Sequence, residues 1–340
     1  MHFFQIWHYF WGASGCFLNL LLVYIAIFKS PKAIRTYATL IVNFAITDFV
    51  ECFFDVFIQI RLLPAPGDVT MTYIFNGFCK YFGDMSCKIG ASLFLHCIPH
   101  AVWSLLLSFG YRYYILHHPG LTRRTLICIL IVIYIPSFVQ GLTYWTNFVE
   151  TDEILPLAKQ IFPSYNFSEE TGVISGIVDV TTITATYAIV HLSFPIFPVY
   201  TIIYILRTKI IAHLLRNSQM MTTETKAVHT QMLRALTFQA FIPIFVWIGA
   251  SCYLISQLGI IQQSPLMEHA VFVSVILMPT LSPFTYLLFV RPYKKFCMKI
   301  IYTLTCSKKR HDDAKGSKFD SHNTPSHIVA LSKVAPISSS

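Results

Sequence analysis

Apolar residues gather in long stretches along this chain, with short polar segments between them. Seven stretches have about 20 residues or more, the length that an α-helix needs to cross the hydrocarbon core of a bilayer. They cover residues 7–28, 38–60, 85–111, 125–146, 180–206, 235–258 and 268–290. Lipid cannot hydrogen-bond to a backbone, and a membrane barrel would show short segments of alternating polarity instead. The pattern therefore predicts an all-α fold in which residues 1–290 form a bundle of seven transmembrane helices, spans 1 to 7.

The composition agrees with a membrane protein. Of the 340 residues, 55% are hydrophobic and 12% are charged, and the mean hydropathy is +0.58. Because a soluble domain usually carries about a quarter charged residues, these values exclude a soluble enzyme, a nucleic-acid module and a disordered chain. The net charge of +9 does not indicate a nucleic-acid partner, since most basic residues lie in short loops between the spans.

Basic residues are distributed unequally between the two sets of loops. The segments that follow spans 1, 3, 5 and 7 hold fifteen Lys and Arg residues as far as Lys299, whereas the opposite segments hold four, Arg61, Lys80, Lys88 and Lys159. Basic loops stay in the cytoplasm, so this bias predicts an outer N-terminus and a cytoplasmic C-terminus, with span 1 as an uncleaved signal. The sequon Asn166-Phe167-Ser168 then lies in an outer loop, and Asn166 is a candidate glycosylation site.

The end of the chain has a different character. Residues 291–306 alternate basic and apolar side chains at helical spacing, which predicts a short amphipathic helix on the inner leaflet. Cys306, at the end of this segment, is either a palmitoylation site or a free thiol. Residues 307–340 are polar, which is typical of a disordered cytoplasmic tail.

Polar residues within a membrane span are costly and usually functional. Span 2 carries Asp48, Glu51 and Asp55 at positions i, i+3 and i+7, which puts the three acids near one face of a helix. That face must look into the bundle. It could serve an ion or proton pathway, or it could form a local network in which one carboxyl is protonated and hydrogen-bonded.

Span 3 carries His96 and His100, one helical turn apart. A pair at this spacing can bind zinc, but no third ligand at a diagnostic spacing accompanies it, so no metal site is predicted. The helical rise places Asp55 and His96 at one depth, roughly 25 Å above the inner ends of their spans. This predicts a hydrogen bond between Asp55 and His96, or between Glu51 and His100.

Two features at the inner end of the bundle suit a conformational switch. Arg112, at the end of span 3, could hold the bundle closed and then release toward a partner protein, or it could anchor the helix by reaching the lipid headgroups. In span 7, Pro283 removes a backbone hydrogen bond and permits a kink. Tyr286 lies three residues further along, near the inner end.

These residues together resemble the rhodopsin-like G-protein-coupled receptors. Asn19 and Asp48 match that family's asparagine in span 1 and aspartate in span 2. Tyr111-Arg112-Tyr113 resembles the Asp-Arg-Tyr motif with its first residue changed, and residues 282–286 resemble Asn-Pro-x-x-Tyr with Ser in place of Asn. The resemblance implies a signalling switch made of Asn19, Asp48, Arg112, Ser282, Pro283 and Tyr286.

The chain departs from that family in three places. Cys87 stands at the family's span 3 cysteine, but residues 147–179 contain no cysteine to pair with it, so Cys79 and Cys87 could pair with each other or stay reduced. Span 6 has Pro243 without the Cys-Trp-x-Pro motif. The acid before Arg112 is absent, which removes the usual partner of that arginine.

A closer resemblance accounts for these departures. The stretches 103–118, 231–245 and 278–293 are similar to nematode serpentine chemoreceptors, most of all serpentine receptor class delta, and the resemblance covers about residues 7–300. It implies a receptor in the plasma membrane of sensory cilia, without a cofactor or catalytic activity. Such a receptor binds an external odorant or pheromone and activates a heterotrimeric G protein. We expect the ligand in the outer half of the bundle, at Asp55, His96, His100, His191 and Trp247.

Two other classes of membrane protein fit the sequence less well. A transporter or channel that uses the acidic face of span 2 usually shows repeated halves or broken helices, and this chain has no internal repeat. A membrane enzyme would need a metal cluster or a nucleophile–base set, and none stands out.

The predicted orientation has a direct test. An epitope inserted after Cys306 should be out of reach of antibodies and proteases in intact cells, and should become accessible once the membrane is permeabilised. Exposure of that epitope in intact cells would overturn the orientation, together with the inner-end roles given to Arg112 and Tyr286.

Overall fold

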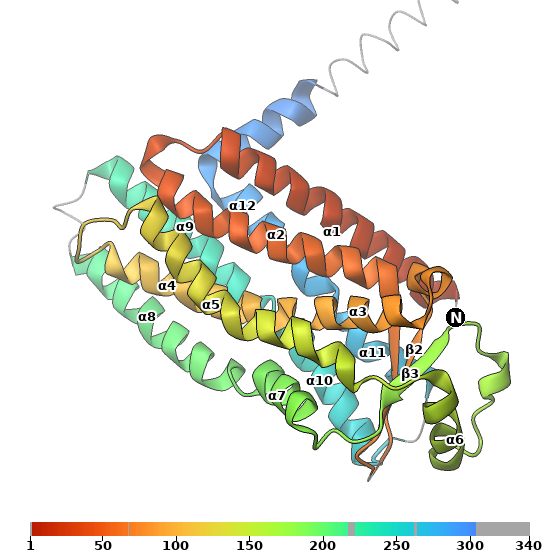
Figure 1. The fold of residues 1–340 in the computed structure, drawn as a ribbon. Coiled ribbons are helices and arrows are strands. Elements are labelled where there is room, and N and C mark those ends of the chain that lie inside the picture. The colour runs from red at the N-terminus through yellow and green to blue at the C-terminus, as the bar shows by residue number, and fades with distance from the viewer. Residues whose placement is uncertain (1, 67, 217–221, 262–263, 304–340) are drawn as a thin grey trace, which may run out of the picture. The chain divides into compact units, whose positions relative to one another are not determined.

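The fold is seen in a computed structural model that describes residues 2–66, 68–216, 222–261 and 264–303 (Figure 1). The chain separates into two compact units, Met1–Lys294 and Lys295–Ser340, and the account below concerns the first. Residues 291–303 are helical. Cys306 and the tail 307–340, for which lipidation and disorder are predicted, lie outside the described residues.

Each predicted span corresponds to one helical rod, which is either a single helix or two helices in succession. Spans 1 and 2 are α1 (His2–Phe28) and α2 (Arg35–Ile58). Span 3 consists of α3 (Asp84–Leu95) and α4 (Cys97–Tyr114), and span 4 of α5 (Arg123–Thr143) and the 3-10 helix η3 (Tyr144–Asn147). Spans 5, 6 and 7 are each divided in two: α7 (Ile183–Ser193) and α8 (Ile196–Arg216), α9 (Thr223–Phe241) and α10 (Ile244–Gln257), α11 (Pro265–Val275) and α12 (Leu277–Phe289).

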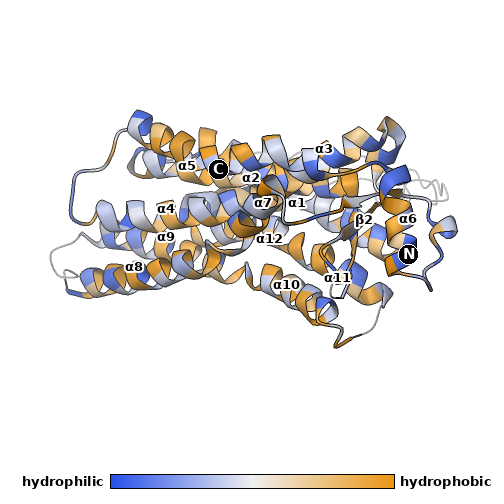
Figure 2. Ribbon diagram, turned by 60° about the horizontal axis from the view of Figure 1, so that its bottom comes forward, coloured by the Kyte–Doolittle hydropathy of each residue, from blue (hydrophilic) through white to orange (hydrophobic). Residues whose placement is uncertain are grey.

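Hydropathy identifies every rod except α2. Six helical segments of the described chain are long and apolar enough to cross a membrane, and they correspond to spans 1 and 3 to 7. α2 has 24 residues, but its acids lower its hydropathy, and Asp48, Glu51 and Asp55 are all buried inside the bundle. Figure 2 shows apolar residues along the rods and hydrophilic ones gathered in the connections at their ends. The predicted all-α membrane bundle is confirmed.

Four rods are broken where a proline removes a backbone hydrogen bond. Pro99 has no N–H to donate to Leu95, and α3 ends at Leu95; in the same way Pro279 follows the end of α11 at Val275. Pro195 and Pro243 lie at the breaks of spans 5 and 6, and Pro198 lies in the first turn of α8. Pro283 lies inside α12 without a break. The interruption of span 7 is therefore at Ile276, about two turns before Pro283 of the sequence motif.

A small antiparallel sheet covers one end of the bundle. Its strands are β1 (Ile60–Leu63), β2 (Met71–Phe75) and β3 (Val173–Ile177), in the order β1-β2-β3. Ile60 pairs with Phe75, and Met71 pairs with Ile177. The other short elements are α6 (Thr151–Ile161) and the 3-10 helices η1 (Lys32–Ile34), η2 (Phe78–Phe82) and η4 (Phe167–Glu169). The apolar pattern gave no sign of these strands, because each has only four or five residues.

Two apolar clusters attach this sheet to its surroundings. One lies between the sheet and the helices, and its buried members include Ile58, Ile60, Phe75, Phe94, Phe148 and Phe272. The other joins the sheet to α6 through residues such as Ile74, Ile154 and Phe162. Packed side chains thus fill the space beneath the sheet, and we refer to the sheet with α6 as the cap.

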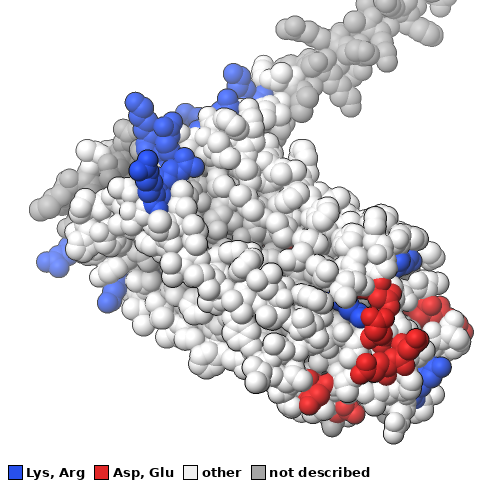
Figure 3. Space-filling model, in the orientation of Figure 1, with Lys and Arg blue, Asp and Glu red and all other residues white. Residues whose placement is uncertain are grey.

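Charged residues separate by sign along the bundle (Figure 3). Acids gather at the end covered by the cap, where the chain has Glu150, Asp152, Glu153, Glu169 and Asp179. Basic residues gather at the opposite end, where it has Arg35, Arg123, Arg124, Lys209 and Arg216. We call these the acidic end and the basic end. This is the asymmetry from which the sequence predicts the orientation.

Cys79 and Cys87 form a disulfide, which decides between the alternatives that the sequence left open. The bond joins η2 to the first turn of α3, and both cysteines are fully buried. It closes a loop between residues eight positions apart, so it fastens the chain locally at the acidic end.

Replacing both Cys79 and Cys87 by Ala should lower the melting temperature of the purified protein. A closed loop of this length removes about 2.5 kcal/mol of entropy from the unfolded chain in the loop-closure account. The measurement is thermal unfolding in detergent, with Cys128→Ala, at an exposed free thiol of α5, as the control. Equal melting temperatures for the double variant and the control would show that the bond does not stabilise the fold.

Candidate functional site

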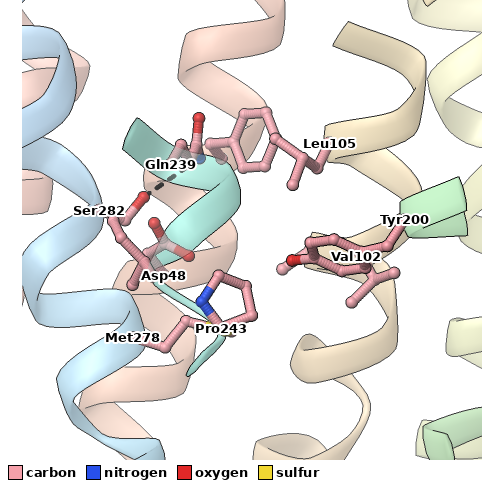
Figure 4. A pocket seen from close by; sticks show the side chains of 11 residues that line it. Asp48, Val102, Leu105, Tyr200, Gln239, Pro243, Met278 and Ser282 are labelled. Atoms are coloured by element: carbon pink, nitrogen blue, oxygen red, sulfur yellow. Dashed lines mark hydrogen bonds between the residues drawn. The ribbon is translucent and has the colours of Figure 1, made fainter. Parts of the chain in front are cut away.

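Asp48, Ser282 and Gln239 meet around a small cavity inside the bundle (Figure 4). The cavity has about 20 Å³ of space, which is enough for about one water molecule. Figure 4 shows these three polar side chains on one side, with Tyr200 of α8 and Val102 of α4 facing them. The site is too small for an odorant, but it brings together polar residues from α2, α9 and α12.

Gln239 connects span 6 to span 7. Its amide group donates a hydrogen bond of 3.3 Å to Ser282 Oγ, and its amide oxygen accepts one of 2.6 Å from the Tyr286 hydroxyl. Gln239 and Tyr286 are 5% and 0% exposed. Hydrogen bonds in such a dry interior are stronger than in water, so this one side chain holds the inner parts of two spans together.

Asn19 connects span 1 to the break in span 7. Its amide group donates to the carbonyl oxygens of Gly15 and Pro279, each at 3.0 Å. Pro279 begins the part of span 7 that also carries Ser282, Pro283 and Tyr286. Asn19, Ser282 and Tyr286 are therefore linked through contacts along span 7, and Asp48 lies beside Ser282 at the small cavity.

Arg112 packs against an aromatic ring in place of an acid. Its guanidinium carbon lies 3.8 Å from the ring centroid of Tyr37 on α2, and the arginine is only 4% exposed. A cation above an aromatic face is attracted by the negative charge density of that face. Tyr37 is thus the partner of Arg112 in the absence of a carboxylate. Arg112 does not extend outward as an ordinary headgroup anchor would.

The predicted bond between Asp55 and His96 is wrong, and so is the one between Glu51 and His100. His8 of α1 places Nδ1 2.8 and 3.0 Å from the two carboxylate oxygens of Asp55. Both oxygens of Glu51 are buried and lack a hydrogen-bond partner among the described residues. Equal depth fixes the height of two side chains but not the direction in which each points around the bundle.

Two glycines let α1 come close enough for the pair of His8 and Asp55. A Cβ atom on Gly12 would overlap Val56, and one on Gly15 would overlap Cys52. The two helices approach more closely there than larger residues would allow, which is the usual role of small residues between membrane helices.

His96 and His100 line a groove of about 610 Å³ between α2, the two halves of span 3 and α5. His96 Nε2 lies 3.1 Å from the Tyr134 hydroxyl, and His100 Nε2 lies 3.3 Å from Asn43 Oδ1. The described residues contain no cluster of three or more metal-ligating side chains at these histidines or elsewhere. The groove opens on the side of the bundle, where lipid would lie.

The other predicted ligand-binding residues lie elsewhere. His191 Nδ1 is 2.7 Å from Gln140 Oε1, and Trp103 Nε1 donates to His191 Nε2 at 3.2 Å. Trp247 is 37% exposed and packs edge-to-face on Phe197. Asp55, His191 and Trp247 therefore have separate surroundings, and the structure brings only His96 and His100 of the five together in one cavity.

Ion pairs hold the cap on the acidic end. Arg61 of β1 pairs with Glu170 of the loop before β3 and lies 3.6 Å from Glu268 of α11. It also donates to the Tyr165 hydroxyl at 2.7 Å. Burial raises the pKa of Tyr165, and its hydrogen bond to Glu170 raises it further. Arg61 is 5% exposed, so this network closes the acidic end with little contact to water.

Comparison with known proteins identifies the family. A family model described as serpentine type 7TM GPCR chemoreceptor Srd matches residues 4–299. The chain belongs to the Srd family of serpentine chemoreceptors. Serpentine receptor class delta-19 and class delta-18 of Caenorhabditis elegans are 55% and 57% identical to this Srd receptor. The matches cover 96% and 88% of this chain, and 97% and 88% of those proteins.

A solved structure supports the fold of this Srd receptor. Squid rhodopsin superposes with a TM-score of 0.53 at 13% sequence identity, covering 92% of this chain and 89% of its own. At that identity the likeness concerns the fold alone. The family match, and not this likeness, identifies the chain as a multi-pass membrane chemoreceptor and not an enzyme.

Sequence reasoning missed four residues that organise these contacts. They are His8, Tyr37, Tyr134 and Gln239. His8, Tyr134 and Gln239 are polar or amphipathic residues within apolar stretches, and Tyr37 directly precedes one; that property is the signal that could have pointed to them. Gln239 lies in the quoted stretch 231–245, but the resemblance assigned no role to it individually.

A double-mutant cycle tests the new partner of Asp55. His8→Ala and Asp55→Asn should each destabilise the receptor by about 1–3 kcal/mol, because each leaves a buried polar group without its partner. The double variant should lose less than the sum of the two, since the partners contact each other. Thermal unfolding in detergent measures all three variants. The control pairs Asp55→Asn with His96→Ala, which should be additive; coupling in that pair instead would contradict the assignment.

Proposed function

We propose that this receptor binds an external small molecule and activates a heterotrimeric G protein through the basic end of its bundle. The observation that carries the proposal is the contact of Gln239 with Ser282 and Tyr286, which joins spans 6 and 7 next to Arg112. The relatives are named serpentine receptors, and the family description names a chemoreceptor. A plasma membrane location, in a sensory cilium, belongs to the same proposal.

In this mechanism the ligand acts by shifting a population. It binds an arrangement in which α9 has moved away from α12 more tightly than it binds the arrangement described here. The Gln239 contacts must break in that movement, and the break in span 6 beside Pro243 lets α9 move while α10 stays in place. Arg112 can then leave Tyr37 and contact the partner protein.

The basic end offers a surface for that partner. A hollow of about 530 Å³ is lined by the first turns of α9, including Ala227 and Gln231, and by Pro31 and Ile34 near η1. Gln231 also accepts a hydrogen bond from the backbone of Arg291, at the end of span 7. Movement of α9 would enlarge this hollow. We infer that the basic end faces the cytoplasm, which leaves the exposed Asn166 on the outside as a glycosylation site.

The transporter alternative gains no support from the described residues. Asp55 is paired with His8, Asp48 lies at the water-sized cavity, and Glu51 is fully buried between them on α2. The cavity that Asp48 lines has only about 20 Å³ of space, which is too small to serve as a path for a hydrated ion.

Replacing Gln239 by Leu should raise nucleotide exchange in the absence of ligand. Losing two buried hydrogen bonds at about 1 kcal/mol each would shift the resting population roughly 10- to 30-fold toward the open arrangement. Tyr286→Phe, which removes one of the two bonds, should give a smaller rise. The measurement is guanine nucleotide exchange on purified G proteins with the receptor in nanodiscs.

The control for this experiment is Tyr204→Phe, at an exposed position of α8, which should leave exchange unchanged. Arg112→Ala should abolish exchange in both the wild-type and the Gln239→Leu backgrounds. Unchanged basal exchange in a correctly folded Gln239→Leu variant would contradict the role of this contact.

A further inference from the structure

We propose that the groove beside α5 binds a single-chain anionic amphiphile that reaches it from the bilayer, and that such a molecule is the receptor's ligand. The claim that this molecule is the receptor's ligand rests on the proposed function, whereas the claim that it binds in the groove does not. We call the site the lateral groove; it is lined by α2, α3, α4 and α5. Its volume of about 610 Å³ lies within the usual range for a small-molecule site, about 300–1,000 Å³.

The wall of the lateral groove is apolar and open to lipid. Ile46 of α2 and Ile127 and Ile131 of α5 line it, and they are 50%, 38% and 59% exposed. Exposed isoleucines on the side of a membrane bundle contact hydrocarbon. A ligand with an apolar chain could therefore slide in from the bilayer without opening the bundle.

The floor of the groove is polar, which contact with lipid alone does not explain. Tyr134, His96, His100 and Asn43 are joined there by hydrogen bonds and ring contacts, with His100 edge-to-face on Tyr134 at 4.8 Å. His100 is 3% exposed, and its Nδ1 has no hydrogen-bond partner among the described residues. An unpartnered buried polar atom is costly, and lipid cannot satisfy it. A hydroxyl or carbonyl on the ligand could do so.

The other end of the groove carries positive charge. A neighbouring cavity of about 130 Å³ shares Thr39, Val42 and Arg123 with the groove and is also lined by Arg35. The hydroxyl of Thr39 is buried and has no partner among the described residues. Neither lining contains an Asp or Glu, so two guanidinium groups there lack a lining carboxylate. Two arginines and a hydroxyl suit a carboxylate, which arginine binds through two parallel hydrogen bonds.

The spacing of the charged and polar ends sets the ligand's shape. Arg123 and Tyr134 are eleven residues apart on α5, which corresponds to roughly 16 Å along the helix. The ligand is therefore elongated, with its anion at Arg35 and Arg123 and its neutral hydrogen-bonding group near His100 and Tyr134. A groove of this volume accommodates one chain and not the two of a phospholipid.

Access from the acidic end is less open. The cap is held there by Arg61, Glu170 and Glu268, and the space beneath it is filled by the apolar cluster that includes Phe75 and Phe272. The cavity beside Asp48 holds only about 20 Å³. The lateral groove thus combines ligand size, unsatisfied polar atoms and a route that leaves the cap in place.

Photo-crosslinking tests this binding site without any G protein. The receptor in nanodiscs of neutral phosphatidylcholine is exposed to a diazirine-bearing lauric acid with a terminal hydroxyl, and the labelled residues are found by mass spectrometry. We expect labels on α2, α4 and α5 at the groove. Ile131→Trp, which fills the groove, and the double variant Arg35→Gln/Arg123→Gln should each reduce labelling about tenfold.

Each variant has a control on α5. Val132→Trp places the same bulk on an exposed residue that does not line the groove, and Arg124→Gln removes a neighbouring charge outside it. Both should label like the wild type. Lauryl alcohol, which lacks the charge, should compete about tenfold less well than lauric acid.

Three results would overturn the proposal. They are equal labelling of the Ile131→Trp and Val132→Trp variants, labels scattered over the lipid-facing surface, and competition by phosphatidic acid but not by lauric acid. The last would mean that a bilayer lipid occupies the groove. Nucleotide exchange measured in parallel separates the two proposals. If the groove is labelled but the amphiphile does not drive nucleotide exchange, the binding site is retained and its coupling to the G protein is overturned. If another ligand drives exchange and the groove is not labelled, the coupling is retained and the binding site is overturned.

Discussion

The hydrocarbon around this receptor cannot hydrogen-bond to it, so a polar side chain within the spans is stabilised when it finds a partner inside the bundle. This constraint explains the most specific contacts of the fold. Gly12 and Gly15 bring α1 against α2, and His8 then meets Asp55. Asn19 reaches the backbone at the break of span 7, and Gln239 reaches Ser282 and Tyr286 below it. Helix packing in the receptor is therefore specified by a few polar pairs as much as by apolar area.

The two ends of the bundle are held in different ways. At the acidic end, a sheet, a disulfide and the buried ion pairs of Arg61 act together, so many contacts must break before that end can open. At the basic end the contacts between spans include those of Gln239 with Tyr286, Arg112 with Tyr37 and Arg207 with Thr237. The contacts described at that end include neither a sheet nor a disulfide, which is consistent with the proposed conformational change at that end.

The seven rods could be predicted from the apolar stretches of the sequence, α2 among them despite its three acids, since stretches of sufficient length have few alternatives in a membrane. The family resemblance could single out Asn19, Asp48 and Tyr286 as residues of one switch, but it did not give their contacts. The direction of each side chain could not, because it depends on how neighbouring helices are rotated. For this reason the comparison of depths predicts a hydrogen bond from Asp55 to His96, whereas the partner of Asp55 in the structure is His8. The strands of the cap were missed because four or five residues in a loop carry too little periodicity to be distinguished from turns. Gln239 could not be predicted because its role depends on two contacts with span 7, and the residue type alone does not indicate them.

The disulfide between Cys79 and Cys87 also bears on biosynthesis. In the orientation proposed above, both cysteines lie on the outer side of the membrane, and they belong to one short stretch. The bond can then form as soon as the beginning of span 3 has reached an oxidising compartment. A bridge to the loop between spans 4 and 5 would have to wait until that loop had been made. Formation of this disulfide is then independent of the order in which the later spans are inserted. Once it has formed, Cys79 and Cys87 can no longer pair wrongly with cysteines of those spans.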